Sequence, residues 1–225
     1  MNGMGNRLPA NEPAAEPALA VETERLRERL RRQQPDEFAG LAGAAYSAQE
    51  GGRLSLDLWG APVLFDFPAL VACRERAGTP LALPVQALLM YYLATTDGIR
   101  PSGEWVSFAD LPGGRIYAQA FQGYSGSLLT RAFGEDIQSF GRACLAAGGE
   151  PVAELGDAAF AFAGLPRVPL LVTYWQGEDE IPSASQVLFD STATHHLPID
   201  VCAILGGMLV SRILKARPGG SPNRG

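Results

Sequence analysis

The sequence predicts an α+β fold in which an antiparallel sheet packs against several helices, behind a disordered N-terminal tail. Three observations support this class. Segments with the two-residue apolar repeat of strands cluster along the chain instead of alternating regularly with helices. Other segments carry the wider apolar repeat of helices. Hydrophobic residues make up 47% of the 225 residues, which is enough to build a buried core.

The domain boundaries follow from composition. Residues 1–19 are rich in Asn, Pro, Ala and Glu, a composition that cannot repay the entropy of ordering, so we expect a disordered tail. Residues 20–49 form an N-terminal helical segment, and residues 50–216 form a single α+β domain. Residues 217–225 are expected to be a disordered C-terminal end.

Two helices are predicted in the N-terminal segment. Residues 20–34 contain good helix formers and five arginines, with Leu26 and Leu30 on one face. Because this helix has few large apolar residues, we expect it to dock weakly or to reach a partner. Asp36 is placed to cap a short second helix that runs to Tyr46.

A meander of strands is predicted next. Residues 53–58 alternate polar and apolar side chains, which indicates a half-buried strand, and a turn at 59–62 leads into a second strand at 63–67. A third strand is expected within 69–74. A core helix then begins at Leu83-Pro84 and ends before Asp97-Gly98.

The middle of the chain is predicted to be mainly helical. A short extended piece at 105–108 precedes a turn at 111–114 and helices at 116–121 and 136–147. The segment Ser125-Gly126-Ser127 is interpreted as a turn.

The last third predicts a sheet and a buried helix. Residues 158–162, 168–175 and 186–190 are expected to form antiparallel strands, with a loop at 177–182. Residues 199–214 are apolar on nearly every side, which indicates a helix lying beneath other elements.

Charge and cysteine content restrict the classes of partner. The net charge of -6 disfavours nucleic acid, because affinity for nucleic acid comes chiefly from neutralising phosphates. The three cysteines are far apart in apolar surroundings, so neither a metal motif nor a disulfide framework is indicated. The longest apolar run is about half the length of a membrane-spanning helix. We therefore expect a cytoplasmic protein that does not enter a membrane.

A ligand-binding rim is the first candidate site. Arg167 lies between two prolines that fix its approach, and a rigid guanidinium suits a carboxylate or phosphate. Asp190 ends the predicted last strand, His195 and His196 follow it in the chain, and Trp105 offers a flat aromatic surface. An internal ion pair of Arg167, with Asp157, Asp190 or the acidic loop at 178–180, is the alternative.

A divalent-metal site is the second candidate. Glu178, Asp179 and Glu180 lie in one loop, and Asp190 ends the next strand. Carboxylate oxygens are the ligands that Mg²⁺ and Ca²⁺ prefer. The alternative is a solvated acidic loop.

A series of short motifs resembles a known family. The motifs are Gln86-Ala87-Leu88-Leu89, Gly103-Glu104-Trp105-Val106-Ser107-Phe108, Asp110-Leu111-Pro112-Gly113-Gly114, Leu165-Pro166-Arg167-Val168-Pro169, Gly177-Glu178-Asp179-Glu180-Ile181-Pro182, Leu188-Phe189-Asp190 and Leu197-Pro198. Together they are similar to the domain of unknown function 3786 family of bacterial and archaeal proteins, frequent in anaerobes. The chain departs from that pattern at Ile181, where an aromatic is expected, and at His196, where a tyrosine is expected.

The resemblance implies a metabolic context but does not imply a particular reaction. Some family members carry cysteine-rich iron-sulfur segments, which implies redox or corrinoid metabolism, so a redox role of this chain would depend on a separate partner. Two hypotheses follow. The chain is a binding module for a cofactor, a small anionic ligand or a protein partner, or it is a metal-assisted enzyme that uses the acidic loop, Asp190 and a histidine. The sequence identifies no cofactor.

Overall fold

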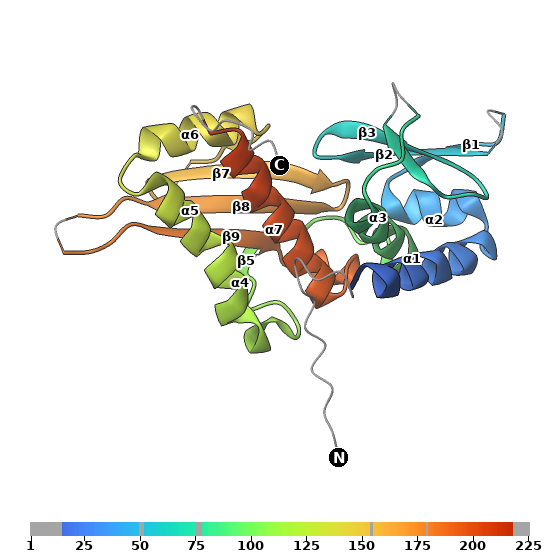
Figure 1. Cartoon of the computed structure of the whole chain (residues 1–225), viewed down its shortest axis with the longest axis horizontal. Helices are drawn as coiled ribbons and strands as arrows, with labels where there is room; N and C mark the ends of the chain where they lie inside the picture. The colour runs from blue at the N-terminus through green and yellow to red at the C-terminus, as the bar shows by residue number, and fades with distance from the viewer. Residues whose placement is uncertain (1–14, 50–51, 75–77, 154, 179, 218–225) are drawn as a thin grey trace, which may run out of the picture.

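The computed structural model describes residues 15–49, 52–74, 78–153, 155–178 and 180–217 (Figure 1). The described chain forms two antiparallel sheets that lie side by side, with helices packed against them. The predicted α+β class is confirmed. The expected single sheet is two sheets, because the strands of the first meander pair only with one another. The predicted tail up to residue 14 and the C-terminal end from residue 218 lie outside the described residues.

The first helix, α1 (Ala15–Arg31), packs along α3 (Leu83–Thr95). Helix α1 begins before the predicted start at Ala20, so residues 15–19 are helical and not part of a tail. Leu26 and Leu30 are buried, as expected for two residues on one face. The helix is therefore an integral part of the fold, and the prediction of weak docking is wrong.

Two arginines attach α1 to the turn that precedes β4. Arg27 Nε donates a hydrogen bond to the carbonyl oxygen of Leu70 (3.1 Å), and Arg31 Nε donates one to that of Pro68 (2.8 Å). Both guanidinium groups also contact the carboxylate of Glu24. Both arginines are thus bonded within the chain.

The smaller sheet follows a short helix, and its strand order is β1-β2-β3-β4. The elements are α2 (Pro35–Ala42), β1 (Ala45–Ser47), β2 (Arg53–Leu58), β3 (Ala61–Asp66) and β4 (Ala72–Arg74). Strand β2 has the predicted bounds. Helix α2 ends well before Tyr46 because Gly43 adopts a left-handed conformation (φ 67°) that terminates it. Its N-cap is Gln34 and not Asp36, so that prediction is wrong.

The larger sheet has the strand order β5-β9-β8-β7-β6. Its strands are β5 (Trp105–Ser107), β6 (Glu150–Pro151), β7 (Ala158–Leu165), β8 (Val168–Trp175) and β9 (Ala184–Asp190). The three predicted antiparallel strands of the last third are confirmed as β7, β8 and β9. The longer strands lie in the middle of the sheet, and the shortest strands form its edges.

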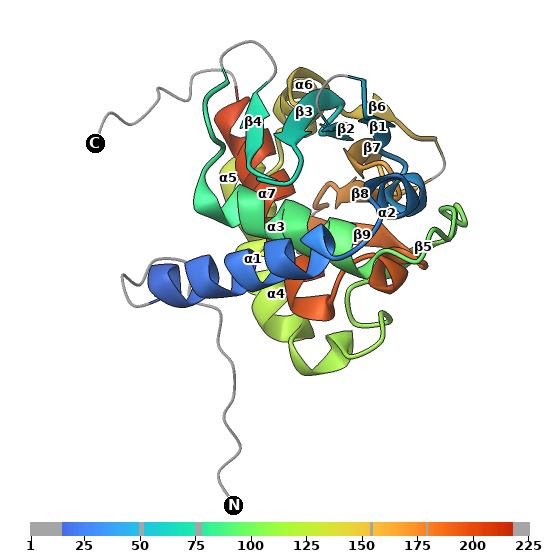
Figure 2. The same cartoon turned by 90° about the vertical axis from the view of Figure 1, so that its right-hand side faces the viewer.

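One face of the larger sheet is covered by four helices, and no helix lies on the opposite face of the described sheet (Figure 2). The covering helices are α4 (Ala118–Tyr124), α5 (Gly126–Phe133), α6 (Ile137–Ala146) and α7 (Ile199–Lys215). Helix α7 is buried along most of its length, as predicted. The phenylalanines of the core, such as Phe160, Phe162 and Phe189, lie between the sheet and these helices.

Helix α5 was missed in the sequence. Ser125-Gly126-Ser127 resembles a turn, but Gly126 begins α5. A Cβ atom on Gly126 would lie 2.0 Å from the carbonyl oxygen of Ser185 on β9, so the helix approaches the strand too closely for any side chain there. The glycine therefore serves a close contact between a helix and a strand and not a turn.

A backbone hydrogen bond joins the two sheets: Trp59 N, in the β2–β3 turn, donates to the carbonyl oxygen of Gly164 on β7 (3.0 Å). None of the helices in the described residues is both long enough and apolar enough to cross a membrane.

Candidate functional site

Asp190 is buried at the end of β9, and every part of its carboxylate is in use. Oδ1 accepts hydrogen bonds from the amide and hydroxyl of Ser102 (3.0 and 3.1 Å) and from the amide and hydroxyl of Thr192 (3.0 and 2.6 Å). Oδ2 accepts one from the Gly103 amide (2.7 Å). Burial raises the pKa of this carboxyl, but the hydrogen bonds outweigh burial and leave its pKa below the ordinary value. Asp190 is thus an ionised group that holds two loops together.

Arg167 lies in the β7–β8 turn and is bonded to the end of α2. Its Nε donates to the carbonyl oxygen of Leu41 (2.6 Å) and its second guanidinium nitrogen to that of Gly40 (3.3 Å). The last carbonyls of a helix have no partner within the helix and carry partial negative charge, which suits an arginine. The internal partner of Arg167 is therefore a helix terminus and not the carboxylate that the sequence suggested.

The adjacent histidines differ in environment. His196 is fully buried, with Nδ1 2.8 Å from the Thr96 hydroxyl and with its carbonyl oxygen accepting from the Thr95 hydroxyl (2.6 Å). Burial lowers the pKa of His196, so its ring is neutral at pH 7. Its Nε2 is buried without a hydrogen-bond partner in the described structure. His195, in contrast, is half exposed, and its Nδ1 lies 2.7 Å from Oδ2 of Asp97.

The structure brings all five predicted rim residues together, because Trp105 is paired with Asp190 across β5 and β9. The charges of Asp97, Arg167, His195 and Asp190 all act on the ring of His196. This cluster lies where α2 and α3, from the smaller half, meet the start of α7 and the larger sheet. Arg167 is bonded to the end of α2, and His196 is bonded to Thr96 just after α3, so the cluster joins the two halves.

The acidic loop is the tip of the β8–β9 hairpin. Glu178 and Ile181 pair through two backbone hydrogen bonds, from the Glu178 amide (3.1 Å) and the Ile181 amide (2.8 Å). Glu178 and Glu180 are exposed, and Asp179 lies outside the described residues. Asp190 lies at the other end of β9, about 20 Å from the hairpin at the usual rise per residue. Asp190 therefore cannot share an ion with the hairpin carboxylates, and no metal-binding group of three His, Cys, Asp or Glu occurs in the described chain.

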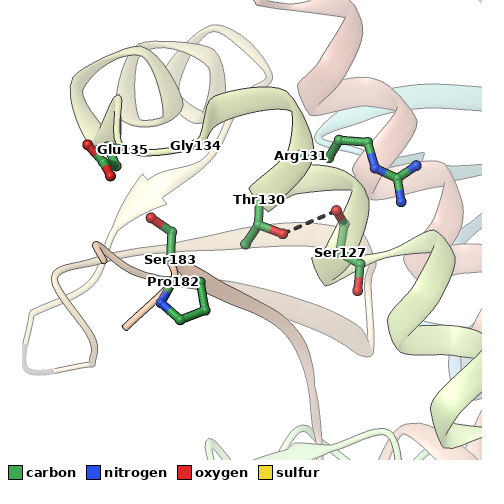
Figure 3. A pocket seen from close by; sticks show the side chains of 7 residues that line it. All are labelled: Ser127, Thr130, Arg131, Gly134, Glu135, Pro182 and Ser183. Atoms are coloured by element: carbon green, nitrogen blue, oxygen red, sulfur yellow. Dashed lines mark hydrogen bonds between the residues drawn. The ribbon is translucent and has the colours of Figure 1, made fainter. Parts of the chain in front are cut away.

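A shallow groove of about 500 Å³, which the sequence did not indicate, lies between α5 and the β8–β9 hairpin (Figure 3). Its seven lining residues are Ser127, Thr130, Arg131, Gly134, Glu135, Pro182 and Ser183, and five of them have polar side chains. The Thr130 hydroxyl donates within its own helix, 3.1 Å from the Ser127 carbonyl oxygen, and the Ser183 hydroxyl accepts from Gly177 N (2.9 Å). Arg131 and Glu135 lie at opposite ends of the groove and point apart (Figure 3). This shallow, open groove differs from the enclosed pockets that hold cofactors.

The second feature that the sequence did not indicate is the uncovered face of the larger sheet. Strand register places Ser107, Leu188, Leu171 and Ala161 in one row across this face. We define the outer sheet face by the residues of this row and their neighbours on the same side: Trp105, Ser107, Ala159, Ala161, Ala163, Leu171, Thr173, Trp175, Gln186 and Leu188. None of these ten is charged, but the same side also carries Glu150, which pairs with Ala161, and Asp190, which pairs with Trp105. The alternating alanines of β7 are the signal in the sequence that could have revealed it.

Exposure varies across the outer sheet face. Leu171, Thr173 and Ala159 in its middle are buried, whereas Trp175 is 40% exposed. Leu188 is half-buried, and so are Trp105, Ala161 and Gln186. The buried core cluster on the helix side of the sheet does not include Leu171. This face therefore carries a small apolar surface that is separate from the main core.

A comparison with protein-family models assigns this chain to a family. Residues 34–212 match the model of the family described as Domain of unknown function (DUF3786). The matched region spans both sheets and begins just before α2, so the chain belongs to this family. Comparison with curated proteins and with solved structures gave no match.

Proposed function

We propose that the chain is a protein-binding module whose docking surface is the outer sheet face. One observation carries the proposal: the larger sheet is covered by helices on one side only (Figure 2), and the other side of the described strands carries few charges, Glu150 at its edge and Asp190, which is bonded within the chain. An apolar sheet face is normally buried against another layer. A low content of charge together with two tryptophans, Trp105 and Trp175, is typical of a protein interface.

Protein binding accounts for the contacts better than the other two predicted ligand classes. A small anionic ligand at the predicted rim would need a free cation, but Arg167 already holds two helix carbonyls. A cofactor would need an enclosed pocket, whereas the groove beside α5 is shallow and open. Of the predicted rim residues, Trp105 belongs to the proposed docking surface. The other four support the loops and helices beside it.

The family resemblance implies redox metabolism, and in this proposal the partner carries out the redox chemistry. The chain would bind a redox protein and carry out no electron transfer itself. The metal-assisted reaction is a weaker proposal, because Asp190 is separated from Glu178 and Glu180 by the length of β9.

The test is site-specific photo-crosslinking in the cells that produce the protein. A photoreactive residue at Gln186, on the outer sheet face, should give a discrete adduct that a second change, Leu188→Lys, removes. The matched control carries the same photoreactive residue at Ser211, an exposed position on α7. Equal adducts from both positions, or an adduct that persists in the Leu188→Lys chain, would overturn the proposal.

A further inference from the structure

We infer that the joint between the two halves opens locally in acid, because a seam around His196 accepts no second proton while it is closed. We define the seam as residues 95–97, at the end of α3 and just after it, together with residues 195–196, which lead into α7. The seam contains no residue of the outer sheet face, so this inference does not depend on the proposed function.

Three hydrogen bonds close the seam. The His196 carbonyl oxygen accepts from the Thr95 hydroxyl (2.6 Å), and the His196 Nδ1 atom lies 2.8 Å from the Thr96 hydroxyl oxygen. Beside them, His195 Nδ1 lies 2.7 Å from Oδ2 of Asp97. Three consecutive residues of the smaller half are thus bonded to two consecutive residues of the larger half, so both histidines belong to one contact.

The closed seam has no acceptor for a charged His196 ring. The side chain is fully buried, and its Nε2 has no hydrogen-bond partner in the described structure. A doubly protonated imidazole donates from both nitrogens. Whichever nitrogen carries the proton of the neutral ring, the charged ring would therefore bury an unpaired Nε2–H. A buried charge with an unpaired donor is far more costly than a neutral ring, so protonation favours an arrangement in which the ring reaches water.

The titratable and charged groups around the ring in the described structure supply no acceptor. Burial is the main influence and lowers the pKa of the imidazole. Asp97 and Asp190 act against burial, but both carboxylates are bonded elsewhere, Asp97 to His195 and Asp190 to the two loops that it holds together. Arg167 and His195 reinforce the effect of burial. Tyr92, on α3, has its ring centroid 6.3 Å from that of the imidazole and donates its hydroxyl proton to a carbonyl oxygen of α2.

Histidine content makes the response specific to this seam. The chain has two histidines, His195 and His196, and histidine is the side chain whose ordinary pKa, about 6.5, lies between about pH 5 and 8. A ring freed by opening regains that ordinary value, so the population of the open form should rise about 30-fold between about pH 7.5 and about pH 5. The backbone hydrogen bond from Trp59 to Gly164 lies outside the seam and involves no titratable side chain, so the two halves should stay joined there.

Hydrogen exchange of the full chain tests the inference when it is measured at about pH 7.5 and about pH 5 and corrected for the intrinsic pH dependence of exchange. The amides of Thr96, His196 and Leu197 donate backbone hydrogen bonds. Their protection should fall about 30-fold in acid. Low concentrations of urea should not accelerate their exchange. They should accelerate exchange of the β8 amides, because a central strand exchanges only when the chain unfolds.

The same substitution at two adjacent positions supplies the variant and its control. His196→Asn places an amide group where Nδ1 lies and removes the titrating ring, so the acid response should disappear. His195→Asn removes the other histidine and should keep the response. A response that His196→Asn retains, or that His195→Asn abolishes, overturns the inference. If His196→Asn does not fold, the wild-type chain still decides: unchanged protection of the three amides in acid, or exchange that urea accelerates as steeply as that of β8, overturns local opening.

Discussion

Replacing Asp190 with asparagine should destabilise the folded chain by about 2 kcal/mol, because asparagine reproduces only part of the carboxylate's hydrogen bonding. Four donors converge on Oδ1, from Ser102 and Thr192, and the Gly103 amide alone donates to Oδ2. The asparagine oxygen would take the four-donor side, so its NH₂ group would face the Gly103 N–H, donor against donor. The hydrogen bonds that remain would also lose the strength that a charged acceptor adds.

Asp190→Ala should cost more, about 4 kcal/mol, because three loop amides then lose their acceptor. Urea unfolding of the full chain measures both changes as lower midpoints with an unchanged slope. Asp157→Asn is the control, since the Asp157 carboxylate accepts a hydrogen bond of 2.7 Å from the Gln176 amide in an exposed loop. Asp157→Asn should change stability by less than about 1 kcal/mol.

The pH dependence of this effect has a definite sign. The pKa of Asp190 lies below its ordinary value of 3.8, so the unfolded chain takes up its proton at a higher pH than the folded chain. The stabilisation is therefore complete above about pH 4 to 5 and is lost as the pH falls through the folded pKa. The gap between the wild-type chain and Asp190→Asn should narrow in that range. Equal stabilities at pH 7, or a gap that does not change in acid, would refute the reasoning.

Three further predictions concern other buried groups. Tyr92→Phe should cost about 1 to 3 kcal/mol in urea unfolding, because the Ala42 carbonyl oxygen and the Arg167 amide both lose the Tyr92 hydroxyl as a partner. The pKa of His196 is lowered from 6.5, so stability should fall as the pH drops below that value, and His196→Gln should flatten this dependence in unfolding curves taken from pH 7 to pH 5. Cys73, half-buried, should react with a thiol reagent in the folded chain well before the two buried cysteines, whose thiol pKa values are raised by burial.

Each of these has an outcome that contradicts it. Tyr92→Phe with wild-type stability would mean that the two freed backbone groups find other partners. For His196, an NMR titration that gives a ring pKa at or above 6.5 would contradict the effect of burial. Reaction of all three thiols at equal rates would show that the core opens as easily at α6 and α7 as at Cys73.

Much of the local structure could be predicted from the sequence. The alternation at 53–58 and the apolar run at 168–175 predicted β2 and β8 with the observed bounds. Apolar periodicity depends only on residues that are near one another in the sequence, so it can be recognised without knowledge of the fold. Predictions failed where a long-range contact decided the conformation. Gly126 looked like part of a turn because its close contact with Ser185 lies in another element.

The candidate site depended on tertiary structure to a greater degree. The sequence by itself determined the family, the α+β class, and the fact that Arg167 and Asp190 would carry fixed charges. It could not determine what those charges bind, because their partners lie far away in the chain. Leu41 is 126 residues from Arg167, and Ser102 is 88 residues from Asp190. The uncovered sheet face was likewise decided only by the fold, since strand order and helix placement, and not the composition of any one strand, determine which side of a sheet is buried.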